Sequence, residues 1–179
     1  MSSSVQFELT REFLSEIKDA IANDNESFVK EVLEELYAAD ISQILDELER
    51  EEAKYVLSRL PVEIGAGIII NLEEETQHEF VREFSSVQIA RFINYMESDD
   101  SVDLLQGLPI KLREQVISEI SNQEKAKSIL DLLHYEEDCA GGLMGKELIK
   151  ANVNWSVAKC IDEIRRQAGK VNKLYAIYV

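Results

Sequence analysis

The residues best suited to chemistry are acidic, and they lie in the stretch SDDSVDLL at 98–105. Asp99 and Asp103 are four residues apart, so in a helix their carboxylates share one face and repel each other by about a few tenths of a kcal/mol. Mg²⁺ would relieve this repulsion, because it binds through one or two carboxylates and retains several waters. Asp99 and Asp103 are therefore the candidate metal ligands, and weak binding is expected. The alternative is that Asp99 and Asp100 only favour a helix N-terminus.

Other side chains offer little chemistry. His78 and His134 have no His, Cys or acidic partner at a spacing typical of metal ligands. Cys139 and Cys160 are too far apart for a CxxC motif or a disulfide framework. The sequence contains no glycine-rich phosphate loop, nucleophile elbow or HExxH motif. No catalytic or cofactor-binding residue is assigned, and the chain is not expected to be an enzyme.

The composition limits the partners that the chain can have. Its 179 residues carry a formal net charge of −16, with a pI near 4.5. Nucleic acid is therefore not an expected partner, whereas cations and basic surfaces are attracted. No window approaches 18 continuous apolar residues, so no membrane span is expected in this chain. Without a secretory signal and with two cysteines, a reducing cytoplasm is the expected setting.

A repeat of 24 residues organises most of the chain, with copies at 38–61, 62–85, 86–109 and 110–133. Within each copy the apolar columns fall at i, i+1 and i+4, twice over, which indicates helices rather than strands. Turns are predicted in the acidic or polar segments 49–52, 73–76, 97–100 and 121–124. The five columns are apolar in all four copies: Ile44/Ile68/Phe92/Val116, Leu45/Ile69/Ile93/Ile117, Leu48/Leu72/Met96/Ile120, Leu57/Val81/Leu105/Ile129 and Leu60/Phe84/Leu108/Leu132.

Each copy therefore predicts a pair of short helices. Helices of two or three turns are marginal alone and must stack on their neighbours. Apolar residues between Phe13 and Leu36 have the same spacing and are expected to form an N-terminal cap. The predicted fold class is all-α: a superhelical stack of short helix pairs, similar to armadillo or HEAT repeats. The sequence leaves the hand of the superhelix open.

The pattern changes where Gly141, Gly142 and Gly145 follow the acidic segment 136–138. These glycines are expected to end the last helix and release the chain into another domain, with Leu143 and Met144 anchored in an apolar groove. The acidic segment is either a second cation-attracting patch or a solvated turn. The predicted domains are therefore 1–138, the helical stack, and 139–179.

Residues 139–179 predict an incomplete α/β unit. The segment Leu148–Ala151 is predicted to be short and extended. A helix is predicted to start at Val157, with Ser156 as its N-cap and Trp155 as the apolar residue before the cap. Residues 174–179 are strand-like. One strand–helix–strand unit cannot bury its sheet, so the chain is expected to be a fragment whose last strand is exposed or paired with another chain.

The stretch YEEDCAGGLMGKELIKANVNWSV closely resembles the junction of the MgtE family of magnesium transporters, in which a helical N domain joins paired CBS domains. AADISQILDEL at 38–48 is similar to the N domain, and WSVAKCIDEIRRQ is similar to the first helix of a CBS domain. The resemblance covers nearly the whole chain. It implies that 1–138 is the N domain and that 139–179 is the linker and an incomplete first CBS domain.

The resemblance also implies a function: regulation of a homodimeric, channel-like transporter. The transporter spans the cell membrane, and the region present in this chain lies at the cytoplasmic face. Its N and CBS domains sense Mg²⁺ and hold the gate shut when Mg²⁺ bridges their acidic surfaces. The partners would be Mg²⁺ and the chain's own CBS and transmembrane domains. Asp99 and Asp103 match N-domain acids at the family's Mg²⁺ interface, whereas a further family glutamate falls on Gly67. The alternative function is an acidic helical-repeat scaffold that binds a basic partner.

Overall fold

The computed structural model describes residues 7–136, 139–168 and 177–178. The chain divides into two compact units, Met1–Tyr95 and Met96–Val179. The division falls between the two helices of the third repeat, and each unit is described by itself.

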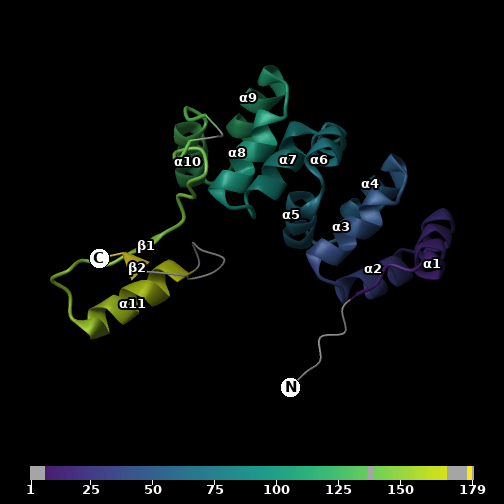
Figure 1. Ribbon diagram of the computed structural model, residues 1–179, viewed down its shortest axis with the longest axis horizontal. Helices are drawn as coiled ribbons and strands as arrows, with labels where there is room; N and C mark the ends of the chain where they lie inside the picture. Colours follow the sequence, from purple (N-terminus) through teal and green to yellow (C-terminus); the bar gives the residue numbers. More distant parts are fainter. Residues whose placement is uncertain (1–6, 137–138, 169–176, 179) are drawn as a thin grey trace. The chain divides into compact units, whose positions relative to one another are not determined.

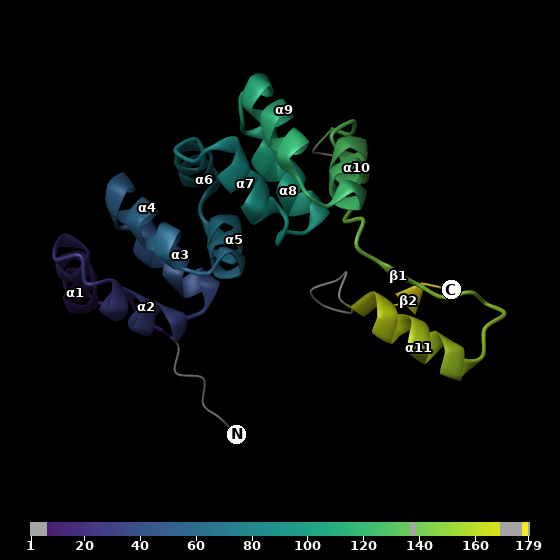
Figure 2. The ribbon, with the colours of Figure 1, turned by 180° about the vertical axis from the view of Figure 1, so that it is seen from behind.

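The first unit consists of short helices joined by tight turns (Figure 1). Helix α1 packs on α2, and both contact α4; α5 lies between α3 and α7 and packs on each of them. Figure 2 shows the same succession from behind. The helices are α1 (Arg11–Ala22), α2 (Glu26–Glu34), α3 (Ala38–Asp46), α4 (Arg50–Arg59), α5 (Val62–Asn71), α6 (Glu74–Val81) and α7 (Ser86–Ile93).

The second unit continues the repeat and ends in a small α/β element. Helix α8 packs on α10. Strands β1 and β2 pair in parallel, with Ile149 opposite Ile177 and Lys150 opposite Tyr178. The elements are α8 (Ser98–Gln106), α9 (Ile110–Glu119), α10 (Gln123–Leu132), β1 (Ile149–Lys150), α11 (Val157–Gln167) and β2 (Ile177–Tyr178).

The burial of the repeat columns confirms the helical repeat and the all-α class. Every residue of 38–133 is described, and none of them lies in a strand. Of the twenty column residues, all except Leu48 and Ile117 are buried. The N-terminal cap is also confirmed as a helix pair, with Ile17, Val29 and Leu33 in its core. The columns are therefore the positions at which each short helix buries its apolar stripe.

The turns lie slightly earlier than predicted, because the acidic segments begin helices rather than connect them. Helices α4, α6, α8 and α10 start at 50, 74, 98 and 123. Acidic residues occupy the first turn of each of these helices, where the helix dipole favours negative charge. Glu49 and Glu52 add a reciprocal capping box at the start of α4.

Two glycines in α5 allow neighbouring helices to approach closely. A Cβ at Gly65 would lie 2.8 Å from Cε1 of Phe92 on α7, and one at Gly67 would lie 3.2 Å from Cβ of Ala38 on α3. The start of α3 would have to shift slightly to accept a side chain at Gly67.

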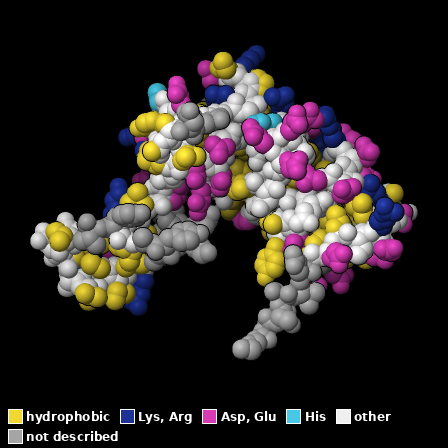
Figure 3. Space-filling view, viewed as in Figure 1, with side chains coloured by type: hydrophobic (Ala, Val, Ile, Leu, Met, Phe, Trp, Pro, Cys, Tyr) yellow, Lys and Arg dark blue, Asp and Glu magenta, His cyan; other side chains and the backbone are white. Residues whose placement is uncertain are grey.

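The strand–helix–strand order of the C-terminal element is confirmed. Ser156 caps α11 as predicted, its side chain accepting a hydrogen bond from Lys159 N at 3.3 Å. No residue of α11 is buried, and Val157 is 77% exposed. Figure 3 shows apolar side chains gathered over α11. Ile177 and Tyr178 pair with β1, whereas most of the predicted strand 174–179 lies outside the described residues.

In the part of the chain that the structure describes, no helix is both long and apolar enough to cross a membrane. The domain boundary after residue 138 stays a prediction.

Candidate functional site at the start of helix α8

The acidic side chains singled out from the sequence lie at the start of α8. Asp99 and Asp100 occupy its first turn, and Asp103 lies about one turn further along the helix. The pKa of the Asp100 carboxyl is raised to about 6, chiefly by burial and then by the charges of Asp99, Glu97 and Asp103. The charges of these three acids therefore act on Asp100, whereas repulsion between Asp99 and Asp103 stays a prediction.

Asp99 carries an unsatisfied polar atom. Its Oδ1 is buried and has no hydrogen-bond partner among the described residues. A buried acceptor without a donor is costly, so this oxygen is a place where a cation or a water molecule would be stabilised. Both carboxylate oxygens of Asp99 lie 3.7 Å from the position of a Cβ built on Gly145.

Sequence reasoning missed another acid at this place, Glu147. Its Oε2 lies 3.6 Å from the same built Cβ of Gly145 that Asp99 approaches. The chain after the glycines thus returns to α8 and brings a carboxylate of the junction next to Asp99. The only signal in the sequence was that Glu147 follows the glycine cluster, which does not specify what it contacts.

Hydrogen bonds fix this arrangement. Ser98, which is fully buried, donates from Oγ to Glu147 Oε2 at 2.7 Å and accepts from the backbone N–H of Lys146 at 2.9 Å. The Nζ of Lys146 contacts Oδ2 of Asp131 on α10 at 2.6 Å. We call residues 145–147 the docked junction, because it is bonded to both α8 and α10.

A lysine balances part of the negative charge. The Nζ of Lys125 donates to the carbonyl oxygen of Met96. Burial lowers the pKa of the Lys125 ammonium, and the carboxylates of Glu147, Asp100 and Glu97 oppose this shift. Lys125 therefore supplies one positive charge to a cluster in which acids predominate.

The grouping of acidic side chains does not by itself indicate a metal site at α8. Among the described residues, no three His, Cys, Asp or Glu side chains are grouped so as to hold a metal ion. A cation at Asp99 would therefore keep most of its water, which is how Mg²⁺ commonly binds to proteins. Whether Asp99 and Asp103 bind a metal stays a prediction.

The glycine pair does not have the predicted role of ending a helix. Helix α10 already ends at Leu132. Gly142 and Leu143 instead donate their backbone N–H groups to the carbonyl oxygen of Cys139, at 3.0 and 3.2 Å, to form a turn. A Cβ on Gly141 would lie 2.4 Å from Cδ1 of Tyr135, so the glycine is required for close approach to this ring.

Two further predictions concern the residues around this turn. Leu143 is 76% exposed, so the prediction that it anchors in an apolar groove is wrong; the turn directs it toward solvent. The segment 136–138 was predicted to be either a cation-attracting patch or a solvated turn. Both alternatives stay open, because 137 and 138 lie outside the described residues.

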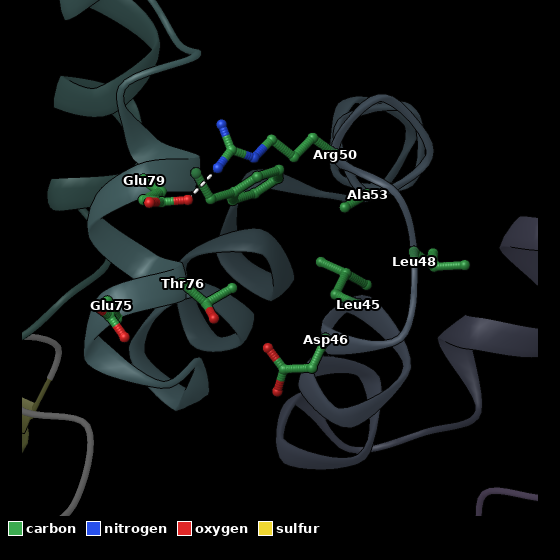
Figure 4. A pocket seen from close by; sticks show the side chains of 9 residues that line it. Leu45, Asp46, Leu48, Arg50, Ala53, Glu75, Thr76 and Glu79 are labelled. Carbon is green, nitrogen blue, oxygen red and sulfur yellow. Dashed lines mark hydrogen bonds and ion pairs between the residues drawn. The ribbon is translucent and has the colours of Figure 1, made fainter.

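A second candidate site is a hollow of about 300 Å³ in the first unit (Figure 4). Arg50 and Glu79 form an ion pair across it, and the side chain of Asp46 points toward Thr76. Burial raises the pKa of the Asp46 carboxyl, and the nearby charges of Glu73 and Glu47 raise it further. The lining residues are Leu45, Asp46, Leu48, Arg50, Ala53, Glu75, Thr76, Glu79 and Phe80.

The fold and the α8 site together define a class: a helical-repeat module with an acidic helix start beside its junction to a small α/β element. The particular family follows from a direct match. Residues 36–138 match the family model of the MgtE intracellular N domain. The chain belongs to this family, and the resemblance at 38–48 is confirmed.

Individual relatives agree with this assignment. The chain is 28% identical over 167 residues to the magnesium transporter MgtE of Thermus thermophilus. The match covers 91% of this chain and 37% of that relative, so the chain spans little more than a third of the relative's length.

Two solved structures are similar. The cytosolic domain of the Mg²⁺ channel MgtE in complex with ATP is 26% identical, with a TM-score of 0.82 and coverage of 93% of this chain and 68% of that chain. The crystal structure of the soluble part of a magnesium transporter is 24% identical, with a TM-score of 0.78 and coverage of 94% and 66%. The second likeness supports the fold alone. These relatives are described as transporter or channel parts, not as enzymes.

Proposed function

We propose that this chain is the Mg²⁺-sensing regulatory region of a MgtE-type magnesium transporter. The observation that carries the proposal is the buried, unpartnered Oδ1 of Asp99 within the acidic start of α8. Membership of the MgtE intracellular N domain family supports it. The rest of the transporter, its homodimeric assembly and its place at the cytoplasmic face of the membrane belong to the proposal.

The proposed mechanism uses charge repulsion as the signal. Asp99 and Asp103 would hold a hydrated Mg²⁺, with affinity on the order of millimolar or weaker because Mg²⁺ gives up its water reluctantly. Burial is the main reason that the pKa of Asp100 is raised, and the charges of neighbouring acids add to it. The bound charge offsets this second contribution. A facing acidic surface can then approach α8 and hold the gate closed. When the Mg²⁺ concentration falls, the two acidic surfaces repel each other and the gate opens.

The facing surface would come from CBS domains, of which β1, α11 and β2 are proposed to be the beginning. Their strand–helix–strand order supports this assignment. The exposed apolar side chains of Val157 and Ile161 on α11 also support it, since they would be covered in a complete α/β domain.

A titration followed by amide NMR tests the proposal on the 179-residue chain. Mg²⁺ and Na⁺ are compared at equal ionic strength, because general screening also weakens repulsion between acids. Mg²⁺ should shift the amide signals around 99–103 more than Na⁺ does, and the double variant Asp99→Asn, Asp103→Asn should abolish the difference. Asp40→Asn is the matched control, since it removes an acid from the first turn of a helix in the other unit. Equal shifts with both cations in the unmodified chain would refute Mg²⁺ sensing at α8.

A second candidate function is the docking of a basic segment, and the hollow between α3, α4 and α6 favours it. Apolar and acidic side chains both line the hollow, and they would accept the stem and the charged end of a lysine or arginine side chain. A lysine-rich peptide should then shift the amide signals of α3 and α6, and Asp46→Asn should weaken its binding. Binding that is unchanged in this variant would refute the hollow as the docking site.

A further inference from the structure

We infer that Ser98 is a positioning residue that couples the acidic start of α8 to the docked junction 145–147, so that a cation bound at α8 fastens the junction. The effect of the cation rests on the proposed function. The hydrogen bonds of Ser98 with Glu147 and Lys146 do not depend on that proposal. No part of the inference requires Ser98 to touch the metal ion.

The first step is the position of Ser98. It is the first residue of α8 and immediately precedes Asp99. Its hydroxyl is fully buried and serves two groups of the junction at once, the Glu147 carboxylate and the Lys146 N–H. A buried hydroxyl that both donates and accepts fixes its partners in direction as well as in distance.

The second step is the effect of charge. Asp99 and Glu147 place carboxylate oxygens within 4 Å of the same point beside Gly145. We infer that repulsion between these two carboxylates opposes the docking of Glu147, whereas the hydrogen bond from Ser98 and the charge of Lys125 favour it. A cation drawn to Asp99 offsets the repulsion and leaves the hydrogen bond unopposed. Docking of the junction should therefore be tighter with Mg²⁺ than without it.

The third step is the consequence of removing the hydroxyl. Ser98→Ala leaves the Lys146 N–H and one oxygen of Glu147 without their buried partner. Ser101 offers a matched control, because it is also fully buried in α8 but its hydroxyl donates to the Glu97 carbonyl oxygen at the start of its own helix, at 2.6 Å. Ser101→Ala removes the same atom from the same helix without touching the junction.

The test follows amide hydrogen exchange at Lys146 in the 179-residue chain, with Mg²⁺ and with Na⁺ at equal ionic strength. Tryptic cleavage after Lys146, identified by mass spectrometry, gives an independent readout. In the unmodified chain Mg²⁺ should slow both processes. Ser98→Ala should speed exchange at Lys146 about tenfold, the effect of losing one hydrogen bond, and should abolish the Mg²⁺ dependence there. Ser101→Ala should behave as the unmodified chain.

Asp99→Asn gives a second variant, which leaves the docked junction itself unchanged. The hydrogen bond from Ser98 to Glu147 and the charge of Lys125 remain, but the repulsion with Asp99 is gone. Lys146 should therefore exchange slowly with or without Mg²⁺. Fast exchange in this variant without Mg²⁺ would overturn the role assigned to repulsion.

The outcomes separate this inference from the proposed function. Equal exchange at Lys146 in Ser98→Ala and Ser101→Ala would overturn the coupling, even if Mg²⁺ still shifted signals at 99–103. Mg²⁺ dependence that persists at Lys146 in Ser98→Ala would also overturn it. If Mg²⁺ has no specific effect at 99–103 in the unmodified chain, the proposed function fails and the cation-dependent coupling fails with it. The comparison without Mg²⁺ would still establish whether Ser98 fastens the junction.

Discussion

Ser98 and Glu147 are 49 residues apart in sequence, yet their side chains share a hydrogen bond of 2.7 Å. Through this bond, the chain that follows the glycine turn is attached to the helix that carries the acidic cluster. The ion pair between Lys146 and Asp131 adds a second attachment, to α10. The junction is therefore a docked segment of the second unit, and a change at α8 has a direct physical route into it.

The raised pKa of Asp100 predicts a pH dependence of stability. Because the folded-state pKa of about 6 lies above the usual value of 3.8, the fold favours the protonated carboxyl. The contribution of Asp100 to stability is therefore favourable at low pH and is lost as the pH rises through about 6. Asp100→Asn should raise the free energy of unfolding at pH 7, by on the order of 1 kcal/mol after allowance for partial exposure.

Urea unfolding at about pH 4 and about pH 7 measures this effect. The lowered carboxyl pKa values elsewhere, such as that of Asp131 beside Lys146, act in the opposite direction, so only the difference between the variant and the unmodified chain is informative. That difference should shrink toward about pH 4, where Asp100 is protonated. A difference that is the same at both pH values would contradict a raised pKa at Asp100.

Contact between Gly141 and Tyr135 predicts the effect of a small substitution. In Gly141→Ala the new methyl group would lie 2.4 Å from a ring carbon of Tyr135, which forces the ring to move. We expect a loss of about 1–3 kcal/mol in the free energy of unfolding. In a Tyr135→Ala background the same change should cost little, because the clash is gone.

Gly145→Ala is the control for that experiment. Its Cβ would make only ordinary contacts, of 3.6 Å or more, so its cost should stay within about 0.5 kcal/mol. Equal costs for the two glycine variants in chemical unfolding would show that the approach to Tyr135 is unimportant.

The repeat columns predict large losses from truncation in either unit. Leu72 is 6% exposed and Leu105 is fully buried, so replacing either by Ala should cost about 2–5 kcal/mol in the free energy of unfolding. Leu130→Ala, at a position that is 47% exposed and outside the columns, should cost much less. A loss below about 0.5 kcal/mol at Leu72 or Leu105 in urea unfolding would contradict their place in the core.

The sequence was sufficient for features that depend on local periodicity. The column at Leu57, Val81, Leu105 and Ile129 is buried in all four copies, because a helical stripe repeats with the helix itself. The N-cap at Ser156 was also predicted, since a cap involves only neighbouring residues.

The candidate site was predicted only in part, because its contacts are not local. Asp99 was identified from its spacing to Asp103, but the approach of Glu147 depends on a turn that returns the chain to α8. The exposure of Leu143 and the contact of Gly141 with Tyr135 depend on the same turn. Such contacts cannot be predicted from side-chain type and spacing alone, because they depend on the path of the chain between the contacting residues.

The central claim, that the acidic start of α8 senses Mg²⁺ to close a transporter, is tested most directly by flux through the full-length protein. Transport would be measured at low and high internal Mg²⁺ for the unmodified protein, for Asp99→Asn with Asp103→Asn, and for Asp40→Asn. High internal Mg²⁺ should close the unmodified protein and the Asp40→Asn control, whereas the double variant should remain open at the same concentration. If the double variant closes at an unchanged Mg²⁺ concentration, the two aspartates only stabilise the start of a helix and the account is wrong.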